Sequence, residues 1–220
     1  MRKKIKILIC FSVLFNLSYS QIDFLQKVYE IDSRKNERGY RSYSREELDT
    51  IVSKGIFSII YESFDVDAYE RQGYIKDKYL RILRYQPSGQ AGISINEYKI
   101  IKFNNYSYLL SSEKHGINTP GFGFTGNELV VFRIENGNLL EDEKLKSKIE
   151  EFRDYKYFTN DKELIKESQK EDFVFEFEEE DNKISIVPVW GYNDIEEKLY
   201  RNKLILKFTG NKIIVESDYE

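Results

Sequence analysis

The chain has 220 residues, with 34 Lys or Arg against 38 Asp or Glu, and 15% of its residues are aromatic. This acidic balance argues against nucleic acid and anionic membrane surfaces as partners, because both are bound through basic patches. Cys10 is the only cysteine, so no disulfide can form within the chain.

Residues 1–20 have the order of a secretory signal peptide. A basic start that includes Arg2 and Lys3 is followed by an apolar run over 7–15 and by small residues up to Ser20. The run is shorter than the roughly 20 residues that span a bilayer, so we expect cleavage after Ser20 and no transmembrane anchor. Residues 1–20 hold four basic and no acidic side chains, so cleavage leaves 30 basic against 38 acidic residues, a net charge of −8. We expect an exported, cysteine-free, acidic protein that is periplasmic or secreted.

An N-terminal extension over 21–43 and a single α+β domain over 44–220 are expected after the signal peptide. In the extension, Phe24, Leu25 and Val28 indicate a short helix ahead of a charged mobile loop. Ser44 with Glu47 three residues later is typical of a helix N-terminus, and apolar residues then recur at helical spacing. This spacing predicts an amphipathic helix over 45–62.

Strands are predicted over most of the middle of the chain. Alternation over 79–85 and apolar runs over 93–103, 106–110 and 129–134 indicate strands, and Asn136-Gly137 indicates a tight turn. A second helix is predicted over 141–155, because acidic residues precede a stripe formed by Leu145, Ile149 and Phe152. The polar segment 161–170 is expected to be a short helix or a loop.

The last quarter of the chain has the clearest β pattern. Phe173, Phe175 and Phe177 alternate with other residues, and further strands follow around 184–188 and 204–208. If Gly210-Asn211 is a two-residue turn, Phe208 lies opposite Ile213 and Leu206 opposite Val215 on one face. The sequence therefore predicts an α+β fold dominated by an antiparallel β-meander, either an open curved sheet or a small barrel. The amphipathic helix precedes this meander, and the second helix lies before the last hairpins.

Three segments carry a resemblance to a known group. The stretch YLRILRYQPSGQ over 79–90 resembles a strand-turn-strand of exported bacterial lipocalin-like β-meander proteins, and 173–186 and 203–215 are similar to their later strands. The lipocalin Gly-x-Trp is absent, and Trp190-Gly191 lies late in the chain in the reverse order. The resemblance covers about a third of the chain. It implies a curved or closed antiparallel sheet that holds a small apolar ligand, and it does not imply catalysis.

Two sequence features that suggest chemistry have simpler interpretations. The segment 121–126 reads Gly-x-Gly-x-x-Gly, but the residues after it indicate a strand, whereas a dinucleotide site needs a helix there. We expect a structural loop. His115 is the only histidine, and without cysteines or a Gly-x-Ser-x-Gly motif it predicts neither a zinc site nor a catalytic triad. We expect an exposed loop histidine, no bound metal and no cofactor.

The remaining candidates are acidic and aromatic side chains. Glu176 and Glu178 are expected on a solvated strand face, with 179–181 in a turn, because they lack the spacing of a calcium loop. Trp190 and Tyr192 form an aromatic cluster beyond a strand. The candidate ligand-binding residues are His115, Trp190, Tyr192, Phe122 and Phe124.

Three classes of function fit these observations. The favoured class is a non-catalytic exported protein that binds a small apolar ligand or an envelope protein. A second is an interaction protein that uses an exposed strand edge or the 121–126 loop. The third is a carboxylate-dependent hydrolase of the cell envelope, which requires two acidic side chains about 5 to 10 Å apart. No sequence motif identifies a catalytic pair, so the sequence favours a protein that is not an enzyme.

Overall fold

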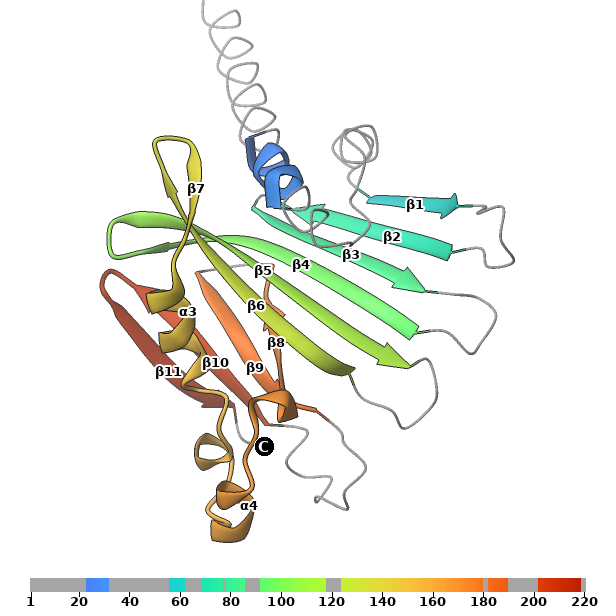
Figure 1. The fold of residues 1–220 in the computed structure, drawn as a ribbon. Helices are drawn as coiled ribbons and strands as arrows, with labels where there is room; N and C mark the ends of the chain where they lie inside the picture. Colours follow the sequence, from blue (N-terminus) through green and yellow to red (C-terminus); the bar gives the residue numbers. More distant parts are fainter. Residues whose placement is uncertain are drawn as a thin grey trace, which may run out of the picture.

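The computed structural model describes residues 23–31, 56–61, 69–76, 78–85, 92–117, 124–179, 182–189 and 202–218. They form two antiparallel β-sheets with a few short helices (Figure 1). The expected signal peptide and its cleavage site lie outside the described residues. Among the helices that are described, none is both long and apolar enough to cross a membrane.

The larger sheet is a seven-stranded meander in the described part of the chain, with strands in chain order and each neighbouring pair antiparallel. Its strands are β1 (Ile56–Tyr61), β2 (Tyr69–Lys76), β3 (Tyr79–Tyr85), β4 (Gly92–Phe103), β5 (Tyr106–Ile117), β6 (Phe124–Glu135) and β7 (Asn138–Glu141). The predicted meander is confirmed, although β5 and β6 are longer than the runs that indicated them.

The prediction of a helix through residue 62 is wrong for its last part. Residues 56–61 are strand β1, which pairs with β2 from Ile56 opposite Tyr74 to Tyr61 opposite Tyr69. The segment IFSIIY is rich in β-branched and aromatic residues, which favour strands, and its apolar spacing fits either periodicity over so short a length. Residues 45–55 of the predicted helix lie outside the described residues.

The turn dipeptides behave as predicted. Asn136 and Gly137 have φ of 50° and 83°, the two positive values that a type I′ turn between β6 and β7 requires. Gly210, with φ of 56°, turns the chain between the last two strands, where Leu206 pairs with Val215 as predicted. Phe208 pairs with Ile213, which confirms the predicted register.

The chain between the two sheets forms short helices, and the first of them is shorter than the helix predicted over 141–155. Helix α3 (Glu143–Glu150) is capped by the Asp142 carboxylate, which accepts a hydrogen bond of 2.9 Å from the Leu145 backbone N–H. Leu145 and Ile149 are buried, as their stripe predicted. A 3₁₀ turn, η1 (Tyr155–Tyr157), replaces the expected end of the helix, and α4 (Lys162–Lys166) and η2 (Lys170–Asp172) follow.

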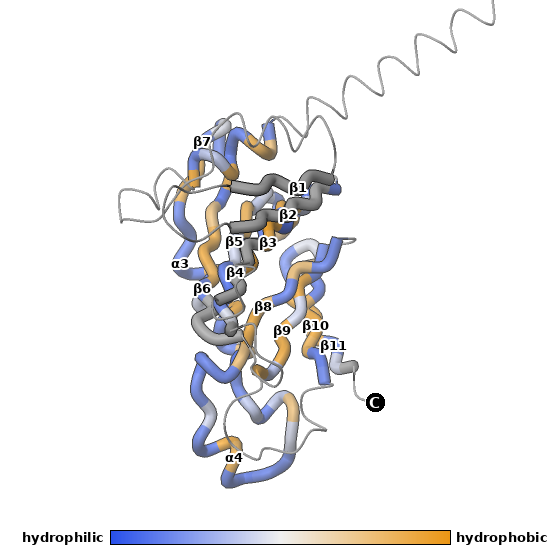
Figure 2. The backbone as a smooth tube through the Cα atoms, turned by 90° about the vertical axis from the view of Figure 1, so that its right-hand side faces the viewer, coloured by the Kyte–Doolittle hydropathy of each residue, from blue (hydrophilic) through white to orange (hydrophobic). Residues whose placement is uncertain are grey.

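The last four strands form a separate smaller sheet instead of extending the first. Its strands are β8 (Phe173–Phe177), β9 (Lys183–Pro188), β10 (Lys203–Thr209) and β11 (Lys212–Asp218), in the order β11-β10-β9-β8. Both strand orders are linear, so within the described residues each sheet is open and neither closes into a barrel. Figure 2 shows the sheets as two layers, with hydrophobic residues along β8, β9 and β10.

Both faces of the larger sheet are covered at β3 to β6, among the residues whose side chains the structure describes. On one face, residues 23–31 form the expected short helix and pack Phe24 and Val28 against Leu80 and Leu109. The other face packs on the smaller sheet through a cluster that includes Ile101. Successive residues of a strand point to opposite faces, which is why these strands are buried on both sides.

Candidate functional site

On the face of the larger sheet that meets the smaller sheet, strand β4 carries apolar residues toward its end and buried charged residues before them. Ile101 and Phe103 belong to the apolar core, whereas Lys99 and Glu97, two and four residues before Ile101, lie on the same face and are also buried. A cleft of about 490 Å³ opens at this charged end. We call it the charged cleft. It is lined by Tyr79, Arg81, Glu97, Lys114, Glu176, Phe177, Glu178, Glu179, Lys183 and Lys203.

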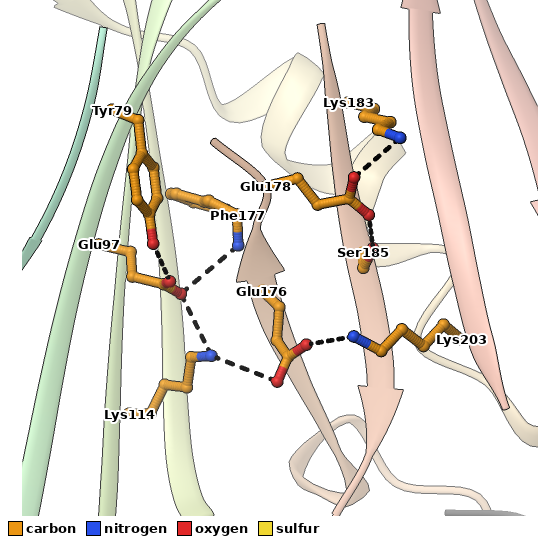
Figure 3. Close-up of polar contacts among 9 residues, drawn as sticks. All are labelled: Tyr79, Glu97, Lys114, Glu176, Phe177, Glu178, Lys183, Ser185 and Lys203. Carbon is orange, nitrogen blue, oxygen red and sulfur yellow. Dashed lines mark hydrogen bonds and ion pairs between the residues drawn. The ribbon is translucent and has the colours of Figure 1, made fainter. Parts of the chain in front are cut away.

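A buried ion pair lies at the centre of the charged cleft. The Lys114 ammonium lies 3.2 Å from one oxygen of the Glu97 carboxylate, and their side chains are only 5% and 4% exposed. The Tyr79 hydroxyl donates to the other Glu97 oxygen at 2.8 Å, and the Phe177 backbone N–H donates to Glu97 at 3.5 Å (Figure 3). Glu97 is thus held by three donors from three strands, which fixes its position.

A second carboxylate shares the same ammonium. Glu176, on the facing strand β8, lies 3.9 Å from Lys114 and 3.0 Å from Lys203 of β10. Lys114 therefore lies between two carboxylates, one from each sheet, whose oxygens are at most about 7 Å apart because each lies within ion-pair distance of the same ammonium.

A third carboxylate is held by its own donors. Glu178 pairs with Lys183 at 2.9 Å and accepts a hydrogen bond of 2.9 Å from the Ser185 hydroxyl (Figure 3). Burial on its own would raise the pKa of Glu178, but these two hydrogen bonds and the positive charges of Lys183 and Lys99 together outweigh it, so its pKa lies below the ordinary value. Glu178 is therefore ionised at neutral pH.

The Tyr79 phenol acts as a donor in this site. Its burial, followed by the negative charge of Glu97, raises its pKa far above the ordinary value. The phenol therefore keeps its proton throughout the physiological range and continues to donate to Glu97.

Lys99 and Asn182 connect the β8–β9 hairpin to the larger sheet. The Lys99 ammonium donates to the backbone carbonyls of Glu178 and of Lys183, the latter at 3.0 Å. Asn182 accepts from the Lys102 N–H at 2.6 Å and donates back to the Lys102 carbonyl. These contacts hold one wall of the charged cleft against the other.

An irregularity in the sheet lies beside Lys114. Glu113 pairs with Glu128 but His115 pairs with Thr125, so β6 places two residues opposite the single residue Lys114. Such β-bulges reorient side chains and are common next to functional sites. Lys114, which lines the charged cleft, is thus the residue that lies opposite the bulge.

Of the five candidate ligand-binding residues, His115 is the one whose side chain the structure describes, and it is not among the residues that line the charged cleft. His115 is on strand β5 and not in a loop, because the β5 ladder extends to Ile117; its exposure was predicted correctly, and its nearest ion-pair partner is Glu113 at 3.5 Å. Phe124 begins β6, and Phe122, Trp190 and Tyr192 lie outside the described residues. The strand predicted after the Gly-x-Gly-x-x-Gly segment is confirmed by β6.

The charged residues of the cleft differ from what the sequence predicted. Glu176 and Glu178 were expected on a solvated face, but they are only half-exposed, because they line the charged cleft at the edge strand β8 and pair with Lys203 and Lys183. Glu97 and Lys114 were missed. For Glu97 the signal was a charged residue within the run 93–103, which needs a partner when it is buried, whereas Lys114 lies in the polar stretch 111–116 and carried no such signal.

The described residues contain no group of three or more His, Cys, Asp or Glu side chains placed to hold a metal ion. Comparison of the chain with protein-family models, with curated proteins and with solved structures finds no match.

Proposed function

We propose that the protein is an exported, non-catalytic binding protein whose charged cleft holds a small zwitterionic ligand, such as a free amino acid or a short peptide. The observation that carries this proposal is the buried Glu97–Lys114 pair at the centre of a cleft between two sheets. Burying two charges has a large desolvation cost, and an apolar pair of similar volume would often be as stable. A binding role explains why charges occupy this position.

The balance of charge in the cleft favours a ligand of both signs. Its lining has four carboxylates and four cations, the latter being Arg81, Lys114, Lys183 and Lys203. A simple anion or cation would leave one member of an ion pair without compensation, which is costly in a desolvated site. A zwitterion offers a carboxylate to the lysines and an ammonium to the glutamates at the same time.

Size and lining support the same ligand class. A volume of about 490 Å³ lies within the range typical of small-molecule sites. The apolar ligand implied by the lipocalin resemblance suits this cleft less well, because eight of the ten lining side chains carry a charge. The proposed ligand is therefore polar rather than apolar.

Thermal unfolding of residues 21–220 with a panel of compounds tests the proposal. The panel contains amino acids, dipeptides, neutral sugars, inorganic phosphate and a fatty acid. We expect amino acids or dipeptides to raise the melting temperature in a concentration-dependent manner, because ligands that bind only the folded state stabilise it. Stabilisation by the fatty acid alone, or by no compound of the panel, would overturn the proposal.

A matched pair of variants links any binding to the cleft. Lys203 pairs with Glu176 at 3.0 Å and its side chain is 47% exposed, while Lys156 pairs with Asp154 at 3.0 Å outside the cleft and is 50% exposed. Removing a charge-assisted contact weakens binding by about 10- to 100-fold. We therefore expect Lys203→Gln to weaken binding by this factor and Lys156→Gln to leave it unchanged.

Hydrolysis is the second candidate function, favoured by one observation. Glu97 and Glu176 lie on either side of Lys114 with oxygens at most about 7 Å apart, a limit that includes the spacing of about 5 Å found in retaining glycosidases. Release of a chromophore from a panel of aryl glycosides, abolished by Glu176→Gln, would favour this function. Absence of turnover with the whole panel would reject it.

A further inference from the structure

Strand β11 is the outermost strand of the smaller sheet. Among the described residues it pairs with β10 on one side and with no strand on the other (Figure 1). Its middle carries two exposed apolar side chains, Ile214 at 43% and Val215 at 38%. Exposed edge strands usually carry charges or proline in the middle, which prevent pairing with another chain. The middle of β11 has no such protection.

The register of the β10–β11 hairpin shows which backbone groups face the free edge. The two-residue turn at 210–211 makes Thr209 and Lys212 a hydrogen-bonded pair. Such pairs alternate along an antiparallel ladder, so Ile214 and Glu216 also bond to β10. The N–H and C=O groups of Ile213 and Val215 therefore point away from β10, toward the edge.

The sequence of β11 is complementary to itself in one antiparallel register. When two copies are placed with a two-fold axis at Ile214, Lys212 of one copy lies opposite Glu216 of the other, and Ile213 opposite Val215. The outward-pointing backbone groups of Ile213 and Val215 then meet each other, as a hydrogen-bonded pair requires. Backbone pairing, apolar contact and charge thus agree in a single register.

Both faces of the strand match in this arrangement. Ile213 and Val215 lie on the face of Phe208 and Leu206, which are buried, so pairing would continue the apolar core across the edge. On the other face, two Lys–Glu pairs would flank the two Ile214 side chains. Because directly opposite residues at a non-hydrogen-bonded pair approach most closely, these two side chains would be in contact.

We propose that two copies of this chain pair through β11 in antiparallel orientation, with the two-fold axis at Ile214, so that their smaller sheets become one continuous sheet. The proposal concerns a surface that is separate from the charged cleft and does not depend on the proposed ligand. It commits to a second copy as the occupant because the self-complementary order of Lys212, Ile214 and Glu216 has no reason to match an unrelated strand.

Analytical ultracentrifugation of residues 21–220, from low micromolar to near-millimolar concentration, tests the proposal. We expect a monomer–dimer equilibrium that Ile214→Glu abolishes, because two carboxylates would then lie opposite each other. Within one chain the new carboxylate lies opposite Lys207, so the fold is retained. Leu140→Glu is the matched control, since Leu140 is also 43% exposed on an edge strand and lies opposite Arg133. This control should dimerise like the wild type.

A charge swap tests the register itself. Lys212→Glu alone and Glu216→Lys alone each place like charges opposite each other and should weaken dimerisation by about tenfold or more. The double variant restores opposite charges and should recover the wild-type dimerisation constant. Circular dichroism and the melting temperature of each variant at low concentration check that the monomer is folded.

Three results would overturn the proposal. A wild-type chain that stays monomeric at every concentration excludes the dimer and leaves the edge to a different partner. A dimer that persists in folded Ile214→Glu excludes β11 as the interface. A folded double variant that does not recover dimerisation excludes the two-fold register at Ile214.

Discussion

Replacing Lys114 by methionine removes the cation between Glu97 and Glu176 while keeping a long apolar side chain. Glu97 would stay buried, with its side chain only 4% exposed, and would keep only neutral donors from Tyr79 and the Phe177 backbone. Removing one partner of a buried ion pair costs about 3 to 5 kcal/mol, because the other charge is left uncompensated. We therefore expect Lys114→Met to lose about this much free energy of unfolding.

The loss corresponds to a fall in melting temperature of about 6 to 20 °C for a domain of this size. Urea unfolding of residues 21–220, followed by circular dichroism, measures the free energy directly and shows whether the slope of the transition is unchanged. The control is Lys146→Met, which breaks the 3.5 Å pair with the exposed Glu143 on α3. It should cost less than about 1 kcal/mol, as exposed pairs do.

The double variant Glu97→Gln/Lys114→Met separates desolvation from packing. Glutamine retains acceptor and donor groups for Tyr79 but carries no charge, so the double variant should be more stable than Lys114→Met alone. The reasoning is refuted if Lys114→Met costs no more than the Lys146→Met control, or if the second substitution adds to the loss instead of reducing it.

The remaining predictions concern pH and capping. Tyr79→Phe should lose about 1.5 to 3 kcal/mol at neutral pH, because a hydrogen bond to a carboxylate is removed. Since the folded-state pKa of Tyr79 is raised, the wild-type advantage should shrink above pH of about 10, where the unfolded phenol ionises; urea unfolding at both pH values checks this, and a constant difference contradicts it. Glu178 has a lowered folded-state pKa, so its contribution is present above the pKa of the unfolded chain and disappears as the pH falls through the lowered value. The stability gap between wild type and Glu178→Gln should therefore be larger at pH of about 7 than at pH of about 3, and an equal gap would be evidence against the assignment. Asp142→Ala should lower the free energy of unfolding by about 1 kcal/mol, because it removes the side chain that caps α3 at the Leu145 N–H. Asp142→Asn keeps a capping oxygen and should change this free energy by less than about 0.5 kcal/mol, as measured by urea unfolding.

Local features of this fold could be predicted from sequence because their causes are local. The Gly210-Asn211 turn and the apolar positions around it determine that Phe208 lies opposite Ile213, and Asn136-Gly137 determines the β6–β7 hairpin. The error at 56–61 has a local cause too. Ile56, Ile59 and Ile60 fit both a helical and a strand pattern, and pairing with β2 decides between them.

The charged cleft could not be predicted, because its contacts join residues far apart in the chain. Phe177 donates to a carboxylate 80 residues earlier, and Lys99 binds a carbonyl 84 residues later. The division of the strands into two facing sheets creates these contacts, and no single strand shows it. Glu97 in an apolar run was a signal that a buried partner is needed, but the run itself could not identify Lys114 as that partner.

The central claim is that the charged cleft between the sheets is the ligand site. Nuclear magnetic resonance of ¹⁵N-labelled residues 21–220, titrated with the amino acid or dipeptide that raises the melting temperature most, tests it most directly. The account predicts saturable shifts of the Glu97, Lys114 and Phe177 amide signals and no shift at Ile214 on the distant edge strand. Shifts confined to other parts of the chain, or none at any ligand concentration, would contradict it.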